Sequence, residues 1–267
     1  MSDTDQNQNN LVSSPENSPE NSQEVVEQLT VSEAITGVFT EPRDTFTTIK
    51  FTPKKNYWIV PIIIIIVLNL IASVISSLDP ELMKNVMDKQ KQKTREQLDE
   101  QVKKGAMTKE QADQQYEQAA QFMNPEGSMF KIIAYVGSVV QPFILLFLMS
   151  LIYFIVLKIL RTTTEFHNIL NVVGLSMLIS GIGLFISTII SIIMGDMQSV
   201  SLSLLFSEES VGSKIYSLIT RFDLFSIWFY TVISIGLAKI SLTSVTKTSV
   251  FVFGIWIIYS VVTSMAF

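Results

Sequence analysis

The stretch PIIIIIVLNLIASVI, residues 61–75, contains no charged side chain and offers no polar face to water. It lies within a longer uncharged run, and about 20 apolar residues in a helix are enough to cross a hydrocarbon core about 30 Å thick. Four more runs of this kind follow, and Asp223 and Lys239 fall near the two ends of one of them, where headgroups would meet them. The predicted spans are residues 57–78, 132–157, 168–194, 222–242 and 248–267. The sequence therefore predicts an all-α, polytopic membrane protein with a bundle of five transmembrane helices.

Composition supports this class and excludes several others. The 267 residues are 48% hydrophobic, and the second half has no polar helices that could cover a soluble core. The chain has no cysteine, so disulfide and thiol chemistry are excluded. The first 50 residues show no basic segment followed by an apolar one, so we expect the first span to act as an uncleaved anchor.

The N-terminal region, residues 1–24, is a polar and acidic segment of low complexity. It contains the tandem repeat SPENSPENS at residues 14–22, and every charged side chain before Arg43 is acidic. Such a composition cannot bury enough apolar surface to offset the entropy lost on ordering. We expect a disordered tail, and we expect no nucleic-acid binding, because no basic, aromatic-bearing patch occurs.

Residues 25–56 form a predicted amphipathic segment ahead of the first span. One stripe of a helix consists of Val31, Ile35, Val38 and Phe39. Pro42 favours the start of a second short helix, which carries Arg43 and Phe46. Lysines, then Tyr57 and Trp58, precede the span, an arrangement typical of a membrane interface. Two alternatives remain open: the segment lies on the lipid surface, or it packs against the bundle.

The polar segment between the first two spans predicts a helical hairpin outside the bilayer, residues 80–124. Acidic and basic residues are about equally frequent in it. Thr108 can cap the second helix, and Gln111 completes a capping box. Its few apolar positions predict that the hairpin leans on the bundle or on a second copy of the chain. A homo-oligomer is therefore possible, although the heptads of a coiled coil are not sustained.

A ladder of small residues marks the third span. It consists of Gly183, Ser187, Ser191 and Gly195, spaced every four residues. Small side chains at this spacing let another helix approach closely. We expect this contact within one chain in preference to dimerisation.

The charges of the short loops predict the orientation. Lys158, Arg161, Lys239 and Lys247 share one side with the N-terminus. On the other side, acidic residues outnumber Lys214 and Arg221. Because basic loops stay in the cytoplasm, we expect a cytoplasmic N-terminus and a C-terminus on the opposite side.

The sequence contains few residues of the types that bind metals or act in catalysis. His167 is the only histidine, so no zinc motif can form, and we expect it to be a solvated loop residue. Ser176 lies in GLSM, residues 174–177, but has no base within reach for nucleophilic catalysis. We therefore expect no catalytic site, no metal and no cofactor, and a protein that is not an enzyme.

Three polar residues within the spans are the only candidates for a transport path: Asn69, Gln141 and Asn171. For Asn69 and Gln141 we favour hydrogen bonds between helices.

Two segments carry a resemblance to a known family. The stretch RFDLFSIWFYTVISIGLAKISL, residues 221–242, resembles the fourth span of prokaryotic members of the Yip (Ypt-interacting protein) domain family. Its signature residues are Asp223, Phe225, Trp228 and Gly236. GVFTEPRDTFTTIK, residues 37–50, resembles the segment that leads into the first span of that family. The resemblance implies a five-helix bundle with a cytoplasmic N-terminus.

Function follows from this resemblance only in outline. Eukaryotic relatives act in vesicle trafficking and bind Rab-type GTPases, but no GTPase-binding residue carries over to this sequence. We expect a non-enzymatic scaffold that organises the lipid bilayer or recruits protein partners of unknown identity. The alternative is a small-solute transporter or channel component.

Overall fold

The computed structural model describes residues 28–52, 54–195 and 200–266. The acidic tail predicted for residues 1–24 therefore lies outside the described residues. Five helices are long and apolar enough to span a membrane. They are α3 (Ile59–Ser77), α6 (Ser128–Ile159), α7 (Phe166–Met194), α10 (Leu224–Ser241) and α11 (Val245–Ala266). The all-α class and the five predicted spans are confirmed, and the protein is an integral, multi-pass membrane protein.

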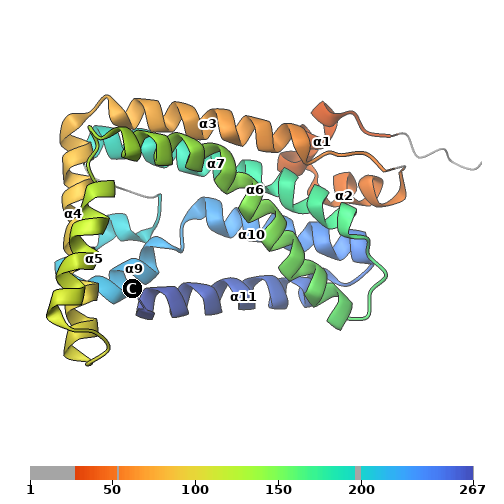
Figure 1. The fold of residues 1–267 in the computed structure, drawn as a ribbon. Coiled ribbons are helices and arrows are strands. Elements are labelled where there is room, and N and C mark those ends of the chain that lie inside the picture. Colours follow the sequence, from red (N-terminus) through yellow and green to blue (C-terminus); the bar gives the residue numbers. More distant parts are fainter. Residues whose placement is uncertain (1–27, 53, 196–199, 267) are drawn as a thin grey trace, which may run out of the picture.

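Helix α7 occupies the centre of the bundle. Its residues 169–179 are all buried, and it packs against α3, α6 and α10, while α11 packs on α10. The spans run side by side along the long axis of the molecule (Figure 1). Outer faces are apolar: α3 exposes Ile63, Val67 and Ile71, which recur every four residues. This stripe is suited to contact with lipid, because the helix already satisfies its own backbone groups.

Two short helices, α1 (Val31–Thr40) and α2 (Pro42–Phe51), pack at one end of the bundle against α7 and α10. We refer to them as the helix pair. A capping box between Thr30 and Glu33 begins α1. The apolar residues Ala34, Val38, Phe46 and Ile49 are buried. Of the stripe predicted from the sequence, Val38 is buried, and Val31, Ile35 and Phe39 are partly buried against the same core.

The opposite end carries the polar hairpin of α4 (Pro80–Lys103) and α5 (Lys109–Phe122). The two helices lie across the ends of the spans (Figure 1). The Thr108 hydroxyl accepts a hydrogen bond from the Gln111 backbone nitrogen at 3.2 Å, and the Gln111 side chain accepts one from the Thr108 nitrogen at 2.9 Å. The hairpin therefore begins its second helix with the capping box that the sequence predicts.

Short helices also lie in the connection between α7 and α10, at the same end as the hairpin. They are η1 (Leu202–Leu205), α8 (Glu208–Val211) and α9 (Ser213–Thr220). α9 packs against α11, so this connection covers the end of the last span.

Candidate functional site

The helix pair docks on α10, although the two segments lie almost 200 residues apart in sequence. The Phe46 side chain of α2 is completely buried. A Cβ atom added to Gly236 of α10 would lie 2.6 Å from Cγ1 of Val172 and 3.0 Å from the Phe46 ring. Real Cβ atoms do not approach neighbours so closely, so glycine at position 236 is what allows α2 and α7 to meet α10. The two segments that carry the family resemblance are therefore in direct contact.

Three signature residues of α10 have further structural tasks. The Asp223 carboxylate caps the helix by accepting a hydrogen bond from the Ser226 backbone nitrogen at 2.9 Å. The Trp228 ring meets the Phe39 ring of α1 edge to face, with centroids 5.6 Å apart. Phe225 packs against α7, as described next. Around the helix pair, Pro42 is half-buried and Arg43 is exposed, so these two residues lie outside the docked core.

The ladder of small residues on α7 has mixed surroundings. A Cβ on Gly183 would lie 2.6 Å from Cβ of Phe225 on α10. Ser191 is buried, and its hydroxyl donates to the Ser187 carbonyl oxygen of its own helix at 2.8 Å. Gly195 ends the helix as a left-handed C-cap with φ 68°. Helix α10 therefore approaches α7 closely at Gly183, whereas Gly195 forms the C-cap of α7.

A second feature, which we name the loop clamp, joins α7 to the segment before α3. Asn171 of α7 is 1% exposed. Its Oδ1 accepts a hydrogen bond from the Tyr57 backbone nitrogen at 2.9 Å, and its Nδ2 donates to the Lys55 carbonyl oxygen at 2.9 Å. His167 Nε2 lies 3.0 Å from the same carbonyl oxygen and donates to it when Nε2 carries the proton. One amide and one imidazole thus satisfy the backbone of a non-helical turn.

The loop clamp extends to the beginning of the helix pair. The Lys55 ammonium and the Tyr57 hydroxyl both donate to the Leu29 carbonyl oxygen, each at 2.8 Å. Lys54 forms a salt bridge of 2.9 Å with Glu165, just before α7. The hydrogen bond and positive charge of Lys54 lower the pKa of the Glu165 carboxyl. The helix pair is therefore fixed at both of its ends.

Sequence reasoning missed this clamp. His167 is not a solvated loop residue: it lies in the first turn of α7, half-buried, and contacts the Lys55 carbonyl. Asn171, which the sequence suggests as a transport residue, binds backbone instead. The spacing of four residues between His167 and Asn171 places both on one face of a helix, and this was the available signal.

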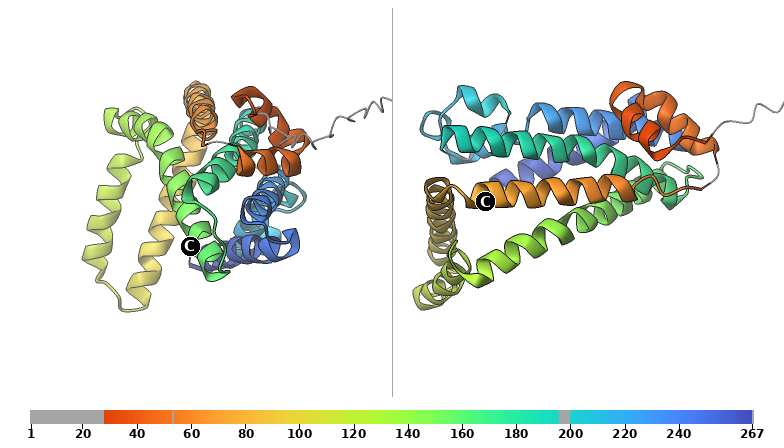
Figure 2. Two further views of the ribbon diagram at one scale, coloured as in Figure 1. Left: turned by 90° about the vertical axis from the view of Figure 1, so that its right-hand side faces the viewer. Right: turned by 90° about the horizontal axis from the view of Figure 1, so that it is seen from above.

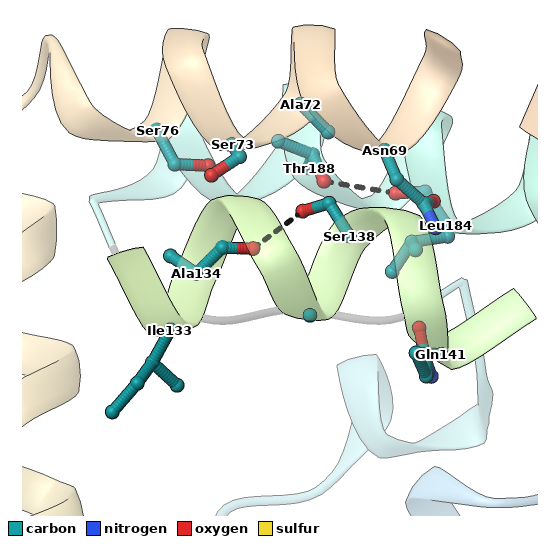
Figure 3. Close-up of a pocket in the computed structure, with 11 residues that line it drawn as sticks. Asn69, Ala72, Ser73, Ser76, Ile133, Ala134, Ser138, Gln141, Leu184 and Thr188 are labelled. Carbon is teal, nitrogen blue, oxygen red and sulfur yellow. Dashed lines mark hydrogen bonds between the residues drawn. The ribbon is translucent and has the colours of Figure 1, made fainter. Parts of the chain in front are cut away.

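A pocket of about 390 Å³ lies between α3, α6 and α7, in the half of the spans nearer the hairpin (Figure 3). Its lining residues are Asn69, Ala72, Ser73, Ser76, Ile133, Ala134, Gly137, Ser138, Gln141, Leu184 and Thr188. Asn69 Oδ1 does not form the hydrogen bond to another helix that the sequence analysis expects. This oxygen is buried and has no partner among the described residues. Gln141 is exposed. Two of the three polar candidates thus meet at this pocket.

Within the part of the chain that the structure describes, no group of three or more His, Cys, Asp or Glu side chains is placed to hold a metal ion. A comparison with known protein families matches residues 36–266 to the Yip1 domain. Neither the curated proteins nor the solved structures give a match. The family match covers both segments that resemble the Yip family, together with all five spans. The chain therefore belongs to the Yip1 domain family.

Proposed function

We propose that this protein is a non-enzymatic membrane scaffold that presents the helix pair as a fixed platform for a protein partner. The docking of Phe46 against Gly236 carries this proposal. A segment that merely tethers a partner has no need of a buried aromatic anchor or of a clamp at both ends. A platform whose position matters needs both.

The outer face of the helix pair suits a polar protein surface. Its exposed side chains carry both signs of charge: Glu33, Glu41, Arg43 and Asp44. Mixed charges steer and orient a partner more than they add affinity. Phe51, 59% exposed at the end of α2, adds one apolar contact beside Lys50 and Lys54.

The platform is proposed to face the cytoplasm. Two short loops lie at the platform end of the bundle. Lys158 and Arg161 lie at the loop between α6 and α7, and Lys239 and Lys247 flank the loop between α10 and α11. Positive residues in short loops favour the cytoplasmic side. This orientation puts the hairpin and the C-terminal end of α11 on the opposite side.

The test uses a photo-crosslinking amino acid at position 43, which is exposed on α2, in native membranes. We expect one dominant protein adduct. Gly236→Val, which forces a clash with Val172 and Phe46, should abolish the adduct. Gly254→Val is the matched control, because a Cβ at this glycine of α11 meets nothing within 4 Å, and it should retain the adduct.

The scaffold proposal fails if no specific adduct forms. It also fails if the adduct persists in Gly236→Val while proteolysis shows that the helix pair has been released. A crosslinker at an exposed hairpin position, such as Lys93, separates a platform partner from one that binds the other end.

The pocket favours transport as a second candidate, because it places Asn69 and Gln141 together near mid-span. Its support is weaker, since Asn171 belongs to the loop clamp. Solute flux into proteoliposomes that is lost in both Asn69→Leu and Gln141→Leu would establish this function. An absence of flux across a broad panel of solutes would reject it.

A further inference from the structure

The pocket between α3, α6 and α7 contains a buried acceptor that the protein does not use. Asn69 is 9% exposed, and its Oδ1 has no hydrogen-bond partner in the part of the chain described here. The side chain reaches from α3 toward Leu184 and Thr188 of α7 (Figure 3). The Thr188 hydroxyl already donates to the Leu184 carbonyl oxygen at 2.9 Å. Burying an unsatisfied polar group is costly. A hydrogen-bond donor from outside the chain would remove this cost for the amide oxygen.

The walls of the pocket form a polar path that leads from the hairpin end to Asn69. On α3, Ser76, Ser73 and Asn69 lie on one helix face, three or four residues apart. On the facing side of α6, Ser138 points toward α3 (Figure 3). α6 diverges from α3 toward the hairpin (Figure 2, right).

The chemistry of the lining defines the ligand. None of the eleven lining residues is charged, so a phosphate or carboxylate would enter the membrane interior without a counter-charge. Asn69 lies eight residues before the end of α3, about 12 Å along the helix axis, which is deep for a charged headgroup. The half-exposed apolar side chains of Ile133 and Leu184 border the pocket. The pocket therefore opens onto the region of the bilayer that contains the acyl chains.

We propose that this pocket binds a neutral lipid with a free hydroxyl group, of the diacylglycerol class, whose hydroxyl donates a hydrogen bond to Asn69 Oδ1. The lipid enters sideways between α3 and α6 from the leaflet next to the hairpin. A volume of about 390 Å³ accommodates the glycerol unit and the first chain carbons, and the remaining chain stays in the bilayer. This site is independent of the platform on which the scaffold proposal rests.

The experiment uses the full-length protein in phosphatidylcholine proteoliposomes with a photoactivatable 1,2-diacylglycerol, whose diazirine lies near the glycerol unit. We expect mass spectrometry to find the label on peptides that contain residues 69–76 and 133–141. Unlabelled diacylglycerol should compete. Its 3-O-methyl ether, which keeps both acyl chains but replaces the hydroxyl hydrogen by a methyl group, has no donor and should compete about three- to tenfold less well, which is the range for one neutral hydrogen bond.

Two variants locate the site. Asn69→Leu removes the acceptor at similar size, and Ser138→Leu fills the pocket from the α6 wall; both should lower the labelling of these peptides several-fold. Thr231→Val is the control, because the hydroxyl of this exposed residue of α10 donates to the Ile227 carbonyl oxygen of its own helix at 2.8 Å and the residue lies outside the pocket lining. Should Asn69→Leu not purify as a single folded species, Ser138→Leu decides alone.

Several results would overturn the proposal. Equal labelling of Ser138→Leu and Thr231→Val would mean that the lipid does not occupy the pocket. Equal competition by the methyl ether would mean that no hydrogen bond to Asn69 Oδ1 contributes to binding. Label spread over all lipid-facing helices would mean that the lipid has no site.

Discussion

The two ends of the bundle are built in different ways. At the platform end, an aromatic side chain and an amide, Phe46 and Asn171, are almost completely buried. At the hairpin end, Asn85 donates one hydrogen bond to the Gly195 carbonyl oxygen at 3.1 Å. The Arg95–Asp113 ion pair, 2.6 Å long, joins the two hairpin helices, and its side chains are 36% and 45% exposed.

This difference has an energetic meaning. Truncating a buried aromatic costs about 3–5 kcal/mol, whereas an exposed ion pair contributes about 0–1 kcal/mol. The platform end is therefore expected to hold one position, and the hairpin end to open locally at little cost. Both segments that resemble the Yip family contribute to the platform end through Phe46 and Gly236, while the family match extends over the hairpin as well.

The largest test of this contrast is Phe46→Ala. Removal of the buried ring should destabilise the docked helix pair by about 3–5 kcal/mol and expose the segment before α3 to protease. Phe51→Ala is the matched control in the same helix, since Phe51 is 59% exposed. Thermal unfolding in detergent and limited proteolysis measure both. Equal behaviour of the two variants would contradict the docked platform.

Asn171→Leu addresses the loop clamp. It removes the hydrogen bonds of Asn171 to the Tyr57 backbone nitrogen and the Lys55 carbonyl oxygen, and each lost bond costs about 0.5–1.5 kcal/mol. The two backbone groups keep their bond to each other at 3.1 Å, and His167 still contacts the Lys55 oxygen. Hydrogen exchange at Tyr57 and in α1 should accelerate, while α11 keeps its protection. Asn56→Ala, at an exposed neighbour in the same turn, should change neither. Unchanged exchange in Asn171→Leu would mean that the clamp does not hold the helix pair.

The five spans could be predicted because their cause is local. A run of about 20 uncharged residues needs no knowledge of the rest of the chain, and a capping box such as that of Thr108 and Gln111 needs only four residues. The loop clamp depends on hydrogen bonds between the Asn171 side chain and backbone groups more than 100 positions away, and a single sequence does not reveal this proximity.

The pocket shows the same limit in another form. Asn69 and Gln141 stand out as polar residues in apolar helices, so their importance was visible. The spatial arrangement of these two residues could not be predicted, because it depends on the divergence of α6 from α3 (Figure 2). The sequence analysis expected each of them to form a hydrogen bond to another helix. On diverging helices they line a pocket.

A smaller effect is expected at the hairpin end from Arg95→Met. This change removes the ion pairs to Asp113 and Asp99 and the cation–π contact with Tyr116, and the expected loss of stability is small because these groups are partly exposed. Hydrogen exchange of α4 and α5 should increase, with the spans unaffected. Lys104→Met, which removes a more exposed pair with Glu100, should be silent. Loss of protection in α7 would show that the hairpin supports the bundle after all.

The smallest effect returns to the platform end, at the exposed salt bridge between Lys54 and Glu165. Lys54 lowers the pKa of Glu165 in the folded protein. A carboxyl with a lowered folded-state pKa stabilises the fold above its unfolded pKa, and this contribution is lost as the pH falls through the folded value. In Lys54→Met, the pKa of Glu165 should rise toward its ordinary value, which carbon-detected NMR of labelled glutamate would measure. The unfolding temperature near neutral pH should scarcely change, because the buried groups of the clamp, and not this exposed pair, hold the helix pair in place. A large loss of stability would mean that the exposed salt bridge, and not the buried groups of the clamp, holds the helix pair in place.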